Sequence, residues 1–225
     1  MSKFLVLTAN IGGKDDLRDP KIQFDNCDYI AIVDRSYNLK IWNEYASYNF
    51  SNIDRYQNRR NAKLYKVLST VLFPQYEYVI WLDANHELKE DPENILKEYG
   101  DFDMLLFRHP HRNCLYEEMK VVSSGAGLDV FDNIRRQEGH YREDGMPENY
   151  GLFEMTCFIQ KNCEYTNIIN LMWWEQICKF SSRDQCSFTY CLWKSQLKLN
   201  LKFFNGFANM YAGGNKYLNE INHVL

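Results

Sequence analysis

The stretch of sequence that decides the fold is Tyr78-Val79-Ile80-Trp81-Leu82-Asp83-Ala84-Asn85-His86. Its apolar first half is typical of a strand buried in a parallel sheet, and the run ends abruptly in an acid and an amide. Ligands of open α/β sheets bind beyond the carboxyl ends of such strands, which is where Asp83 and Asn85 stand. Their oxygens suit Mg²⁺ or Mn²⁺, which often bind one or two protein groups together with substrate phosphates. Asp and Asn are also ordinary turn residues, so a plain polar turn is the alternative.

Length and composition limit the possible classes of protein. The chain has 225 residues, of which 45% are hydrophobic, enough for one domain with a proper core. The 26 Lys and Arg against 30 Asp and Glu give a net charge of -4, which argues against nucleic-acid binding. The apolar part of residues 1–7 is too short for a signal peptide, and we expect no transmembrane segment. Scattered cysteines without a C-x-x-C pair suit a cytoplasmic protein with reduced thiols.

Two further strands are expected to end at the same edge of the sheet. Residues 3–8 form the first, which runs into a polar loop where glycine lets the backbone approach a ligand closely. Residues 27–33 form the second, which ends in an acid that either accepts hydrogen bonds from a nucleoside or caps the next segment of the chain. A G-x-G-x-x-G dinucleotide fingerprint is absent. The candidates for nucleoside binding, with plain turns as the alternative, are Thr8, Asn10, Gly12, Asp34 and Arg35.

Residues 58–73 are the clearest helix, because apolar residues recur at helical spacing and Pro74 comes just after the end. Its first turns carry Arg59, Arg60, Lys63 and Lys66, cations that a helix N-terminus disfavours by about a few tenths of a kcal/mol each. A bound diphosphate would reverse that sign, since helix N-termini and basic side chains both attract phosphate. We therefore expect Arg59, Arg60 and Lys63 to bind phosphate, with a solvated basic face as the alternative.

The second half is expected to alternate helices and strands. We predict helices at residues 91–99, 123–142 and 165–180, strands at 103–107, 151–160 and 199–204, and a loose tail. Ser182 with Gln185 three residues later predicts a capping box that opens another helix.

Several polar and aromatic residues of this half are candidates for substrate binding. The cluster of His109, His111 and Arg112 comes after a strand end and indicates recognition of an acceptor, with an exposed basic turn as the alternative. Glu154 lies inside an apolar run, where an acid needs a polar partner. Trp174 is expected to pack in the core, and stacking on a sugar is the minority interpretation.

Five short motifs occur in the order seen in glycosyltransferases related to the plant mucilage-pectin enzymes, formerly a domain of unknown function. They are Asn61-Ala62-Lys63-Leu64, Leu72-Phe73-Pro74-Gln75-Tyr76-Glu77-Tyr78, Ile80-Trp81-Leu82-Asp83, Tyr116-Glu117-Glu118 and Ser182-Arg183-Asp184-Gln185-x-Ser187-Phe188. The resemblance implies the A-type glycosyltransferase fold, an α/β fold whose central, mostly parallel sheet is flanked by helices. It implies one domain over residues 1–225, with a nucleotide-sugar-binding half to about residue 100 and a smaller mixed acceptor-binding half behind it.

The same resemblance implies the substrates and the cofactor. They are a nucleoside-diphosphate sugar as donor, with a UDP-sugar expected, a glycan or glycoconjugate as acceptor, and usually a divalent metal, Mn²⁺ or Mg²⁺. Asp83-Ala84-Asn85 then stands in for the D-x-D motif, with Asp83 and Asn85 on the metal and Asp83 and Ala84 beside the donor. Asn205 and His223 are the candidates for a third metal ligand.

For the chemical step, Asp184-Gln185 is similar in position to the D-Q motif of retaining enzymes of the glycogenin type, where it lies against the anomeric carbon. We therefore expect Asp184 and Gln185 to be catalytic and the reaction to retain configuration. An inverting reaction would need a base, for which Glu154 and Glu117 are candidates, and Glu117 is also a candidate for acceptor binding. Two alternatives stay open: a nucleotidyltransferase acting on sugar phosphates, and a catalytically silent sugar-binding module.

Overall fold

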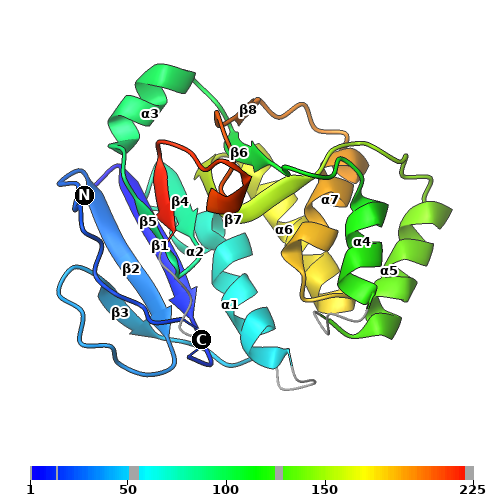
Figure 1. Ribbon diagram of the computed structural model, residues 1–225, viewed down its shortest axis with the longest axis horizontal. Coiled ribbons are helices and arrows are strands. Elements are labelled where there is room, and N and C mark those ends of the chain that lie inside the picture. Colours follow the sequence, from blue (N-terminus) through cyan, green and yellow to red (C-terminus); the bar gives the residue numbers. More distant parts are fainter. Residues whose placement is uncertain (1, 14, 51–55, 125–128, 221–225) are drawn as a thin grey trace.

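The computed structural model describes residues 2–13, 15–50, 56–124 and 129–220, and a seven-stranded sheet forms its centre (Figure 1). The strands lie side by side in the order β3-β2-β1-β4-β7-β6-β8. Their bounds are β1 (Phe4–Asn10), β2 (Cys27–Val33), β3 (Asn43–Ala46), β4 (Tyr78–Leu82), β6 (Met104–Arg108), β7 (Phe153–Lys161) and β8 (Leu201–Phe203). Only β7 is antiparallel to its neighbours, β4 and β6, so the predicted mostly parallel sheet is confirmed.

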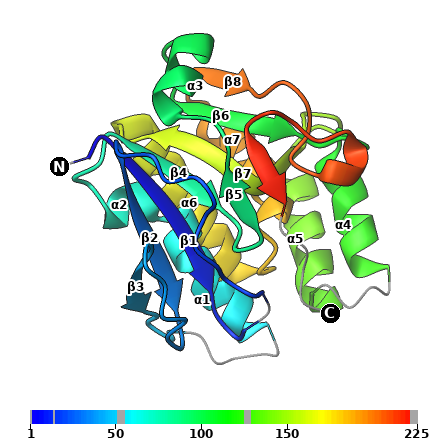
Figure 2. The same ribbon diagram turned by 60° about the vertical axis from the view of Figure 1, so that its left-hand side comes forward.

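The helices cover the two faces of the sheet unequally. They are α1 (Gln57–Val67), α2 (Ser69–Leu72), α3 (Pro92–Tyr99), α4 (Leu115–Ser123), α5 (Phe131–Glu143), α6 (Glu164–Lys179) and α7 (Phe188–Ser195), with short 3-10 turns η1 (Asp184–Cys186) and η2 (Met210–Ala212). Side chains of α1, α4, α5, α6 and α7 enter the core on one face, and α3 packs on the other. Both views show α4 and α5 on the side away from β2 and β3 (Figure 2).

The central strands β1 and β4 are mainly apolar because both faces of the sheet are buried there. In β1, Leu5 and Leu7 belong to the core under α1, whereas Phe4 and Val6 belong to the opposite core. In β4, Trp81 faces the α1 side. Because β2, β1 and β4 run parallel, the polar residues at their carboxyl ends are brought to one edge of the sheet.

The prediction of one helix over residues 58–73 is corrected at its centre. Leu68, with φ of -93° and ψ of 19°, leaves helical geometry and separates α1 from α2. The helix predicted over residues 123–142 is corrected at its start, since α4 ends at Ser123 and α5 begins at Phe131, while residues 125–128 lie outside the described part of the chain.

The predicted loose tail contains a strand. Strand β9 (Leu218–Glu220) pairs antiparallel with β5 (His86–Leu88), which begins directly after Asn85, and Glu220 lies opposite His86. Gly206 permits the turn before it, because its φ is 86° and a Cβ there would lie 2.5 Å from the carbonyl oxygen of Gly214. The tail thus returns to the strand end that the sequence singled out. None of the helices described is both long and apolar enough to cross a membrane.

Candidate active site

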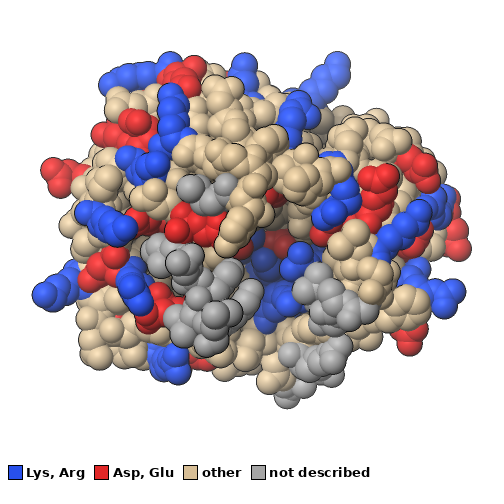
Figure 3. Space-filling model, in the orientation of Figure 1, with Lys and Arg blue, Asp and Glu red and all other residues tan. Residues whose placement is uncertain are grey.

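A cavity of about 640 Å³ lies where β1 and β4 end. The loop after β1, helix α1, the β4–β5 turn, strand β7, helix α4 and η1 all contribute to its wall. Figure 3 shows Lys and Arg side chains inside a hollow on this face of the molecule. Of the residues that the sequence singled out, the cavity brings together Asn10, Gly12, Arg59, Lys63, Asp83, Ala84, Asn85, His109, Arg112, Glu154, Asp184 and Gln185.

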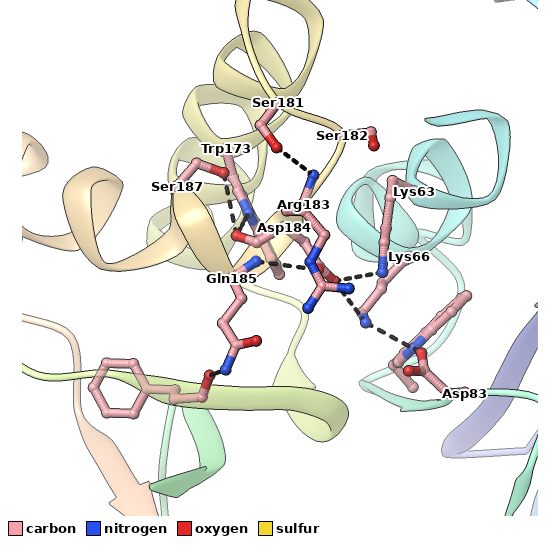
Figure 4. A network of polar contacts seen from close by, with 12 residues as sticks. Lys63, Lys66, Asp83, Trp173, Ser181, Ser182, Arg183, Asp184, Gln185 and Ser187 are labelled. Carbon is pink, nitrogen blue, oxygen red and sulfur yellow. Dashed lines mark hydrogen bonds and ion pairs between the residues drawn. The ribbon is translucent and has the colours of Figure 1, made fainter. Parts of the chain in front are cut away.

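Four charged side chains form a network in this cavity (Figure 4). Lys63 and Lys66 are three residues apart on α1 and therefore share a face. The Nζ of Lys63 lies 2.6 Å from Oδ2 of Asp184, and the Nζ of Lys66 lies 2.7 Å from the same oxygen. Lys66 also lies 3.2 Å from Oδ1 of Asp83, so it links the acid after β4 to the acid of η1.

The network shifts the proton affinity of each member. Burial disfavours the charged Asp184, but the Lys63 and Lys66 ammonium groups outweigh burial and hold the pKa of this carboxyl well below its usual range. The pKa of Asp83 is lowered in the same way, by Lys66 and then Lys63 against the effect of burial. Burial lowers the pKa of Lys63 to about 8 despite the opposing charge of Asp184. Two carboxylates and two ammonium groups thus offset one another.

Asp184 is fixed by hydrogen bonds to its backbone and its side chain. The indole Nε1 of Trp173 donates to the Asp184 carbonyl at 3.0 Å, and the Ser187 hydroxyl donates to the same oxygen at 3.2 Å. The backbone N–H of Gln185 donates to Oδ1 of the Asp184 carboxylate at 3.1 Å. The carboxylate that joins the two lysines is therefore held by both α6 and η1.

The predicted capping box of Ser182 and Gln185 is wrong. The Ser182 hydroxyl and backbone N–H donate to Oδ2 of Asp129, at 2.7 and 2.8 Å, and Ser181 donates to the same oxygen. The side-chain amide of Gln185 donates to the carbonyl of Phe153 at 3.0 Å. Both side chains find partners distant in sequence, and these partners fix the segment that carries Asp184.

His109, Arg112 and Glu118 form a second cluster in the cavity wall, which adjoins the first because Nη2 of Arg183 lies 3.9 Å from Oε1 of Glu118. Arg112 donates from Nε and Nη2 to Oε2 of the buried Glu118, at 2.9 and 2.6 Å. The Nδ1 of His109 accepts from the backbone N–H groups of His111 and Arg112, at 3.2 and 3.1 Å. Burial, and then the Arg112 guanidinium, lower the pKa of His109 to about 4. His109 is therefore a neutral polar group at neutral pH.

The low pKa of His109 predicts a loss of stability in acid. Its folded-state pKa of about 4 lies below the ordinary 6.5, so the unfolded chain binds a proton that the folded chain excludes as the pH falls through this window. Between pH 7.5 and pH 5 we expect the wild type to lose about 2 kcal/mol more unfolding free energy than His109→Gln. Urea titrations at the two pH values measure this difference. Equal pH dependence of the two proteins would contradict it.

Glu154 has the polar partners that its place inside an apolar strand requires. It is 8% exposed, and its Oε2 accepts from the backbone N–H of Ala208 at 2.8 Å. Burial raises the pKa of this carboxyl, although hydrogen bonds from the Ala208 and Asn209 backbone oppose the shift. A carboxyl with a raised pKa that lines the cavity has the chemistry of a general base or acid.

Four of the residues predicted for the donor lie outside the cavity wall. Thr8 is buried within β1. Asp34 accepts from the backbone N–H of Gly12 at 2.7 Å, and Arg35 lies next to this loop and donates to the Tyr37 hydroxyl.

The fourth of these residues, Arg60, is buried between α1 and α6, where its guanidinium donates to the carbonyls of Ile177 and Phe180, both at 3.3 Å. The prediction that Arg60 contacts phosphate is therefore corrected: its guanidinium joins two helices.

The residues predicted for the acceptor are also divided. His109 and Arg112 line the cavity, whereas His111 and Glu117 are exposed outside it. Trp174 lies on α6, partly buried at the margin of the core, and packs edge-on against Phe50 with 5.1 Å between the ring centroids. The buried acid of the Tyr116-Glu117-Glu118 motif that reaches the cavity is Glu118, not Glu117.

The side chains around Asp83 do not form a suitable set of ligands for a divalent cation. In the described ranges, no three His, Cys, Asp or Glu residues are grouped so that they could hold a metal. Oδ1 of Asp83 accepts from the Trp81 indole at 2.8 Å and from Lys66 at 3.2 Å, and Oδ1 of Asn85 lies 2.8 Å from Nδ1 of His86. An ammonium group offers donors and no lone pair, and its charge repels a cation on the same carboxylate.

The other two candidates do not complete this site. Asn205 is exposed and does not line the cavity, and His223 lies outside the described residues. The assignment of Asp83 and Asn85 to a metal therefore stays a prediction that the local charges oppose.

Several cavity residues were not predicted from the sequence as site residues. They are Lys66, Glu118, Arg183, Asn209 and Glu220. The signal for Lys66 was its spacing of three from Lys63 on the same helix face. Glu118 and Arg183 stand inside motifs that the sequence already offered, but Asn209 and Glu220 come from the segment expected to be a loose tail.

Comparison with known proteins identifies the family of the chain. Residues 30–212 match the family of the TOD1/MUCI70 glycosyltransferase-like domain. The chain is 27% identical over 181 residues to the probable hexosyltransferase MUCI70 of Arabidopsis thaliana, a match that covers 75% of this chain. The chain spans only 30% of the length of that relative.

The chain also resembles solved structures of glycosyltransferases. The apo structure of the WbbM bifunctional glycosyltransferase matches with a TM-score of 0.52 and 11% identity, covering 90% of this chain and 39% of that one. Core-mannan synthase A of Aspergillus fumigatus, in a Mn/GDP form, matches with a TM-score of 0.48 and 8% identity over 98% of this chain and 75% of that one. The architecture is the A-type glycosyltransferase fold. The chain belongs to the TOD1/MUCI70 glycosyltransferase-like family.

Proposed function

We propose that the chain transfers a sugar from a nucleoside-diphosphate sugar, a UDP-sugar being expected, to a hydroxyl of a glycan or glycoconjugate. The observation that most directly supports this function is the network of Lys63, Lys66, Asp83 and Asp184 in a cavity at the carboxyl ends of the strands. Such an edge is where α/β folds bind their ligands. Membership of the family and the hexosyltransferase name of its Arabidopsis relative support the same reaction class.

We propose that the loop after β1 receives the nucleoside. Gly12 has a φ of 87°, and a Cβ there would lie 2.3 Å from the side-chain amide nitrogen of Asn58, so only glycine fits without displacing that side chain. Asp34 fixes the loop through the Gly12 N–H, and Asn10 donates to the Asp15 carbonyl at 2.6 Å. A backbone held in this way can approach a nucleoside closely.

We propose that Arg59, Lys63 and Arg183 bind the diphosphate. All three line the cavity, and the pKa of Arg59 is lowered first by burial and then by the like charge of Arg183. Arg183 also lies 3.9 Å from Oε1 of Glu118, and two guanidinium groups close enough to repel each other favour an anion beside them. The acceptor would bind near His109 and Arg112, which also line the cavity.

The proposed step breaks the bond between the anomeric carbon and the diphosphate oxygen, and the electron pair stays with that oxygen. The acceptor oxygen forms the new bond to the anomeric carbon, and its proton passes to the departing phosphate. Attack from the side of the leaving group retains the anomeric configuration and requires no protein base. The positive side chains stabilise the growing charge of the diphosphate, with Asp184 and Gln185 beside the sugar. This step requires no Mn²⁺ or Mg²⁺. The dependence on a divalent metal that the family resemblance implies stays a prediction.

Retention is tested by the first product formed. We expect the NMR spectrum of the new glycoside to show the anomeric configuration of the donor. Glu154→Gln should then lower turnover by less than about tenfold, because a general base normally contributes about 10²–10⁴-fold. The opposite anomer together with a large loss in Glu154→Gln would make Glu154 an inverting base.

The same assay separates the two alternatives. Release of pyrophosphate from a nucleoside triphosphate and a sugar phosphate would select a nucleotidyltransferase. Binding of glycans without turnover of any nucleotide sugar would select a silent sugar-binding module.

A further inference from the structure

We infer that Lys63 and Lys66, rather than a divalent cation, supply the positive charge that accepts the donor's diphosphate, and that Asp83 positions Lys66 instead of binding metal. This inference rests on the proposed function, because it concerns the diphosphate of a nucleotide sugar. It makes the sugar-transfer site of this chain independent of metal.

The geometry places an ammonium group where a metal would bind. The Nζ of Lys66 lies 3.2 Å from Oδ1 of Asp83, the acid at the end of β4, and 2.7 Å from Oδ2 of Asp184. The Lys66 side chain is 1% exposed, and its Nζ lies 5.4 Å from the centroid of the Trp81 ring and 6.0 Å from that of Phe158. Two carboxylates and two rings thus hold this cation in one position.

The two lysines have different tasks because they differ in exposure. The Lys63 side chain is 14% exposed and lines the cavity, so it can contact a phosphate oxygen directly. Lys66 lies deeper and neutralises Asp83, whose side chain is 34% exposed and would otherwise repel a diphosphate. Lys63 is therefore the contact residue in this inference, and Lys66 and Asp83 are positioning residues.

The ammonium group beside Asp83 opposes a dication at the same place. A metal on Asp83 would be close to the Lys66 ammonium, while Asn85 offers a neutral amide that already faces His86 at 2.8 Å. Arg59 and Arg183 line the same cavity and offer further hydrogen-bond donors, although acids line it too and Arg183 lies 3.9 Å from Glu118. A diphosphate, in contrast, can accept hydrogen bonds from several of these basic side chains.

The chemistry requires no cation other than these side chains. An ammonium group has three donors, so Lys63 can bond to Asp184 and to a phosphate oxygen together. As the bond to the anomeric carbon breaks, the electron pair moves to the phosphate oxygen and Lys63 donates to it without giving up its proton. Because the lysines are already fixed, no reorganisation accompanies the growth of charge.

Calorimetric titration of the full chain with UDP, and in parallel with GDP, tests the inference. For the wild type, we expect the dissociation constant in EDTA and in excess Mn²⁺ to agree within about threefold. Binding at least about tenfold weaker in EDTA and restored by Mn²⁺ would overturn the inference while leaving the proposed function intact. Failure of both nucleotides to bind in either condition would overturn the proposed function and this inference with it.

A variant distinguishes a charge role from a purely structural one. We expect Lys66→Met to bind the nucleotide at least about tenfold more weakly in EDTA, because Asp83 is then uncompensated, and to recover with Mn²⁺. Lys179→Met, an exposed change on α6, is the matched control and should behave as the wild type. An equal response to Mn²⁺ in Lys66→Met and the wild type would overturn the inference. The wild-type comparison decides the question without any variant if Lys66→Met does not fold.

Discussion

Asp184→Asn is expected to lower turnover about a hundredfold or more while nucleoside-diphosphate affinity stays the same or increases. Asp184 holds the ammonium groups of Lys63 and Lys66, at 2.6 and 2.7 Å, and its carboxylate accepts from the Gln185 N–H. Without its charge these groups lose their fixed positions, and small displacements in an active site strongly slow the chemical step. Removing a negative charge from an anion site does not weaken anion binding. Steady-state kinetics and calorimetry measure the two effects separately.

The same substitution is expected to reduce the free energy of unfolding by about 3–5 kcal/mol, the range for breaking a buried ion pair. Urea denaturation at the temperature of the kinetic assay measures this loss and shows whether the variant is folded under the assay conditions. Asp101→Asn is the matched control, because this carboxylate is 74% exposed and its pair with Lys161 contributes at most about 1 kcal/mol. Turnover within about tenfold of the wild type, or lost nucleotide binding, would show that Asp184 is only structural.

The parts of the fold that depend on local sequence were predictable. Strand β2 has the predicted bounds, because a continuous apolar run needs no partner to be identified. Helix α3 begins after Asp91, whose side chain accepts from the Glu93 N–H at 2.9 Å. Asp83 stands at the end of β4 for the same local reason, so the edge that carries the site was visible in the sequence.

The parts that depend on distant partners were not predictable. Ser182 has the residue type and spacing of an N-cap, yet its hydroxyl donates to Asp129, which precedes it by 53 residues. Lys66 resembles any solvated lysine of a helix until Asp83 and Asp184 are brought to it. Glu220 reaches the cavity only because β9 pairs with β5. A local pattern contains no information on which of several polar side chains will be brought together.

Trp173→Ala is expected to reduce the free energy of unfolding by about 3–5 kcal/mol, the range for truncating a large buried aromatic side chain. Trp173 is 0% exposed, and its ring lies 4.7 Å from that of Phe188 and 6.0 Å from that of Phe158. Its removal leaves a cavity between α6, β7 and α7. Urea denaturation measures the loss, and a decrease below about 1 kcal/mol would mean that the surrounding helices collapse into the space.

The link between this core residue and the site is isolated by Trp173→Phe. This change keeps most of the ring but removes the Nε1 donor to the Asp184 carbonyl, leaving the Ser187 hydroxyl as the remaining side-chain donor at 3.2 Å. We expect a loss of about 1 kcal/mol in stability, the net value of one hydrogen bond, together with lower turnover at unchanged nucleotide affinity. Trp174→Phe, on the neighbouring position of α6, is the matched control because Trp174 packs against Phe50 outside the cavity. Equal turnover in the two variants would mean that the bond to Asp184 stabilises the fold without positioning the acid for catalysis.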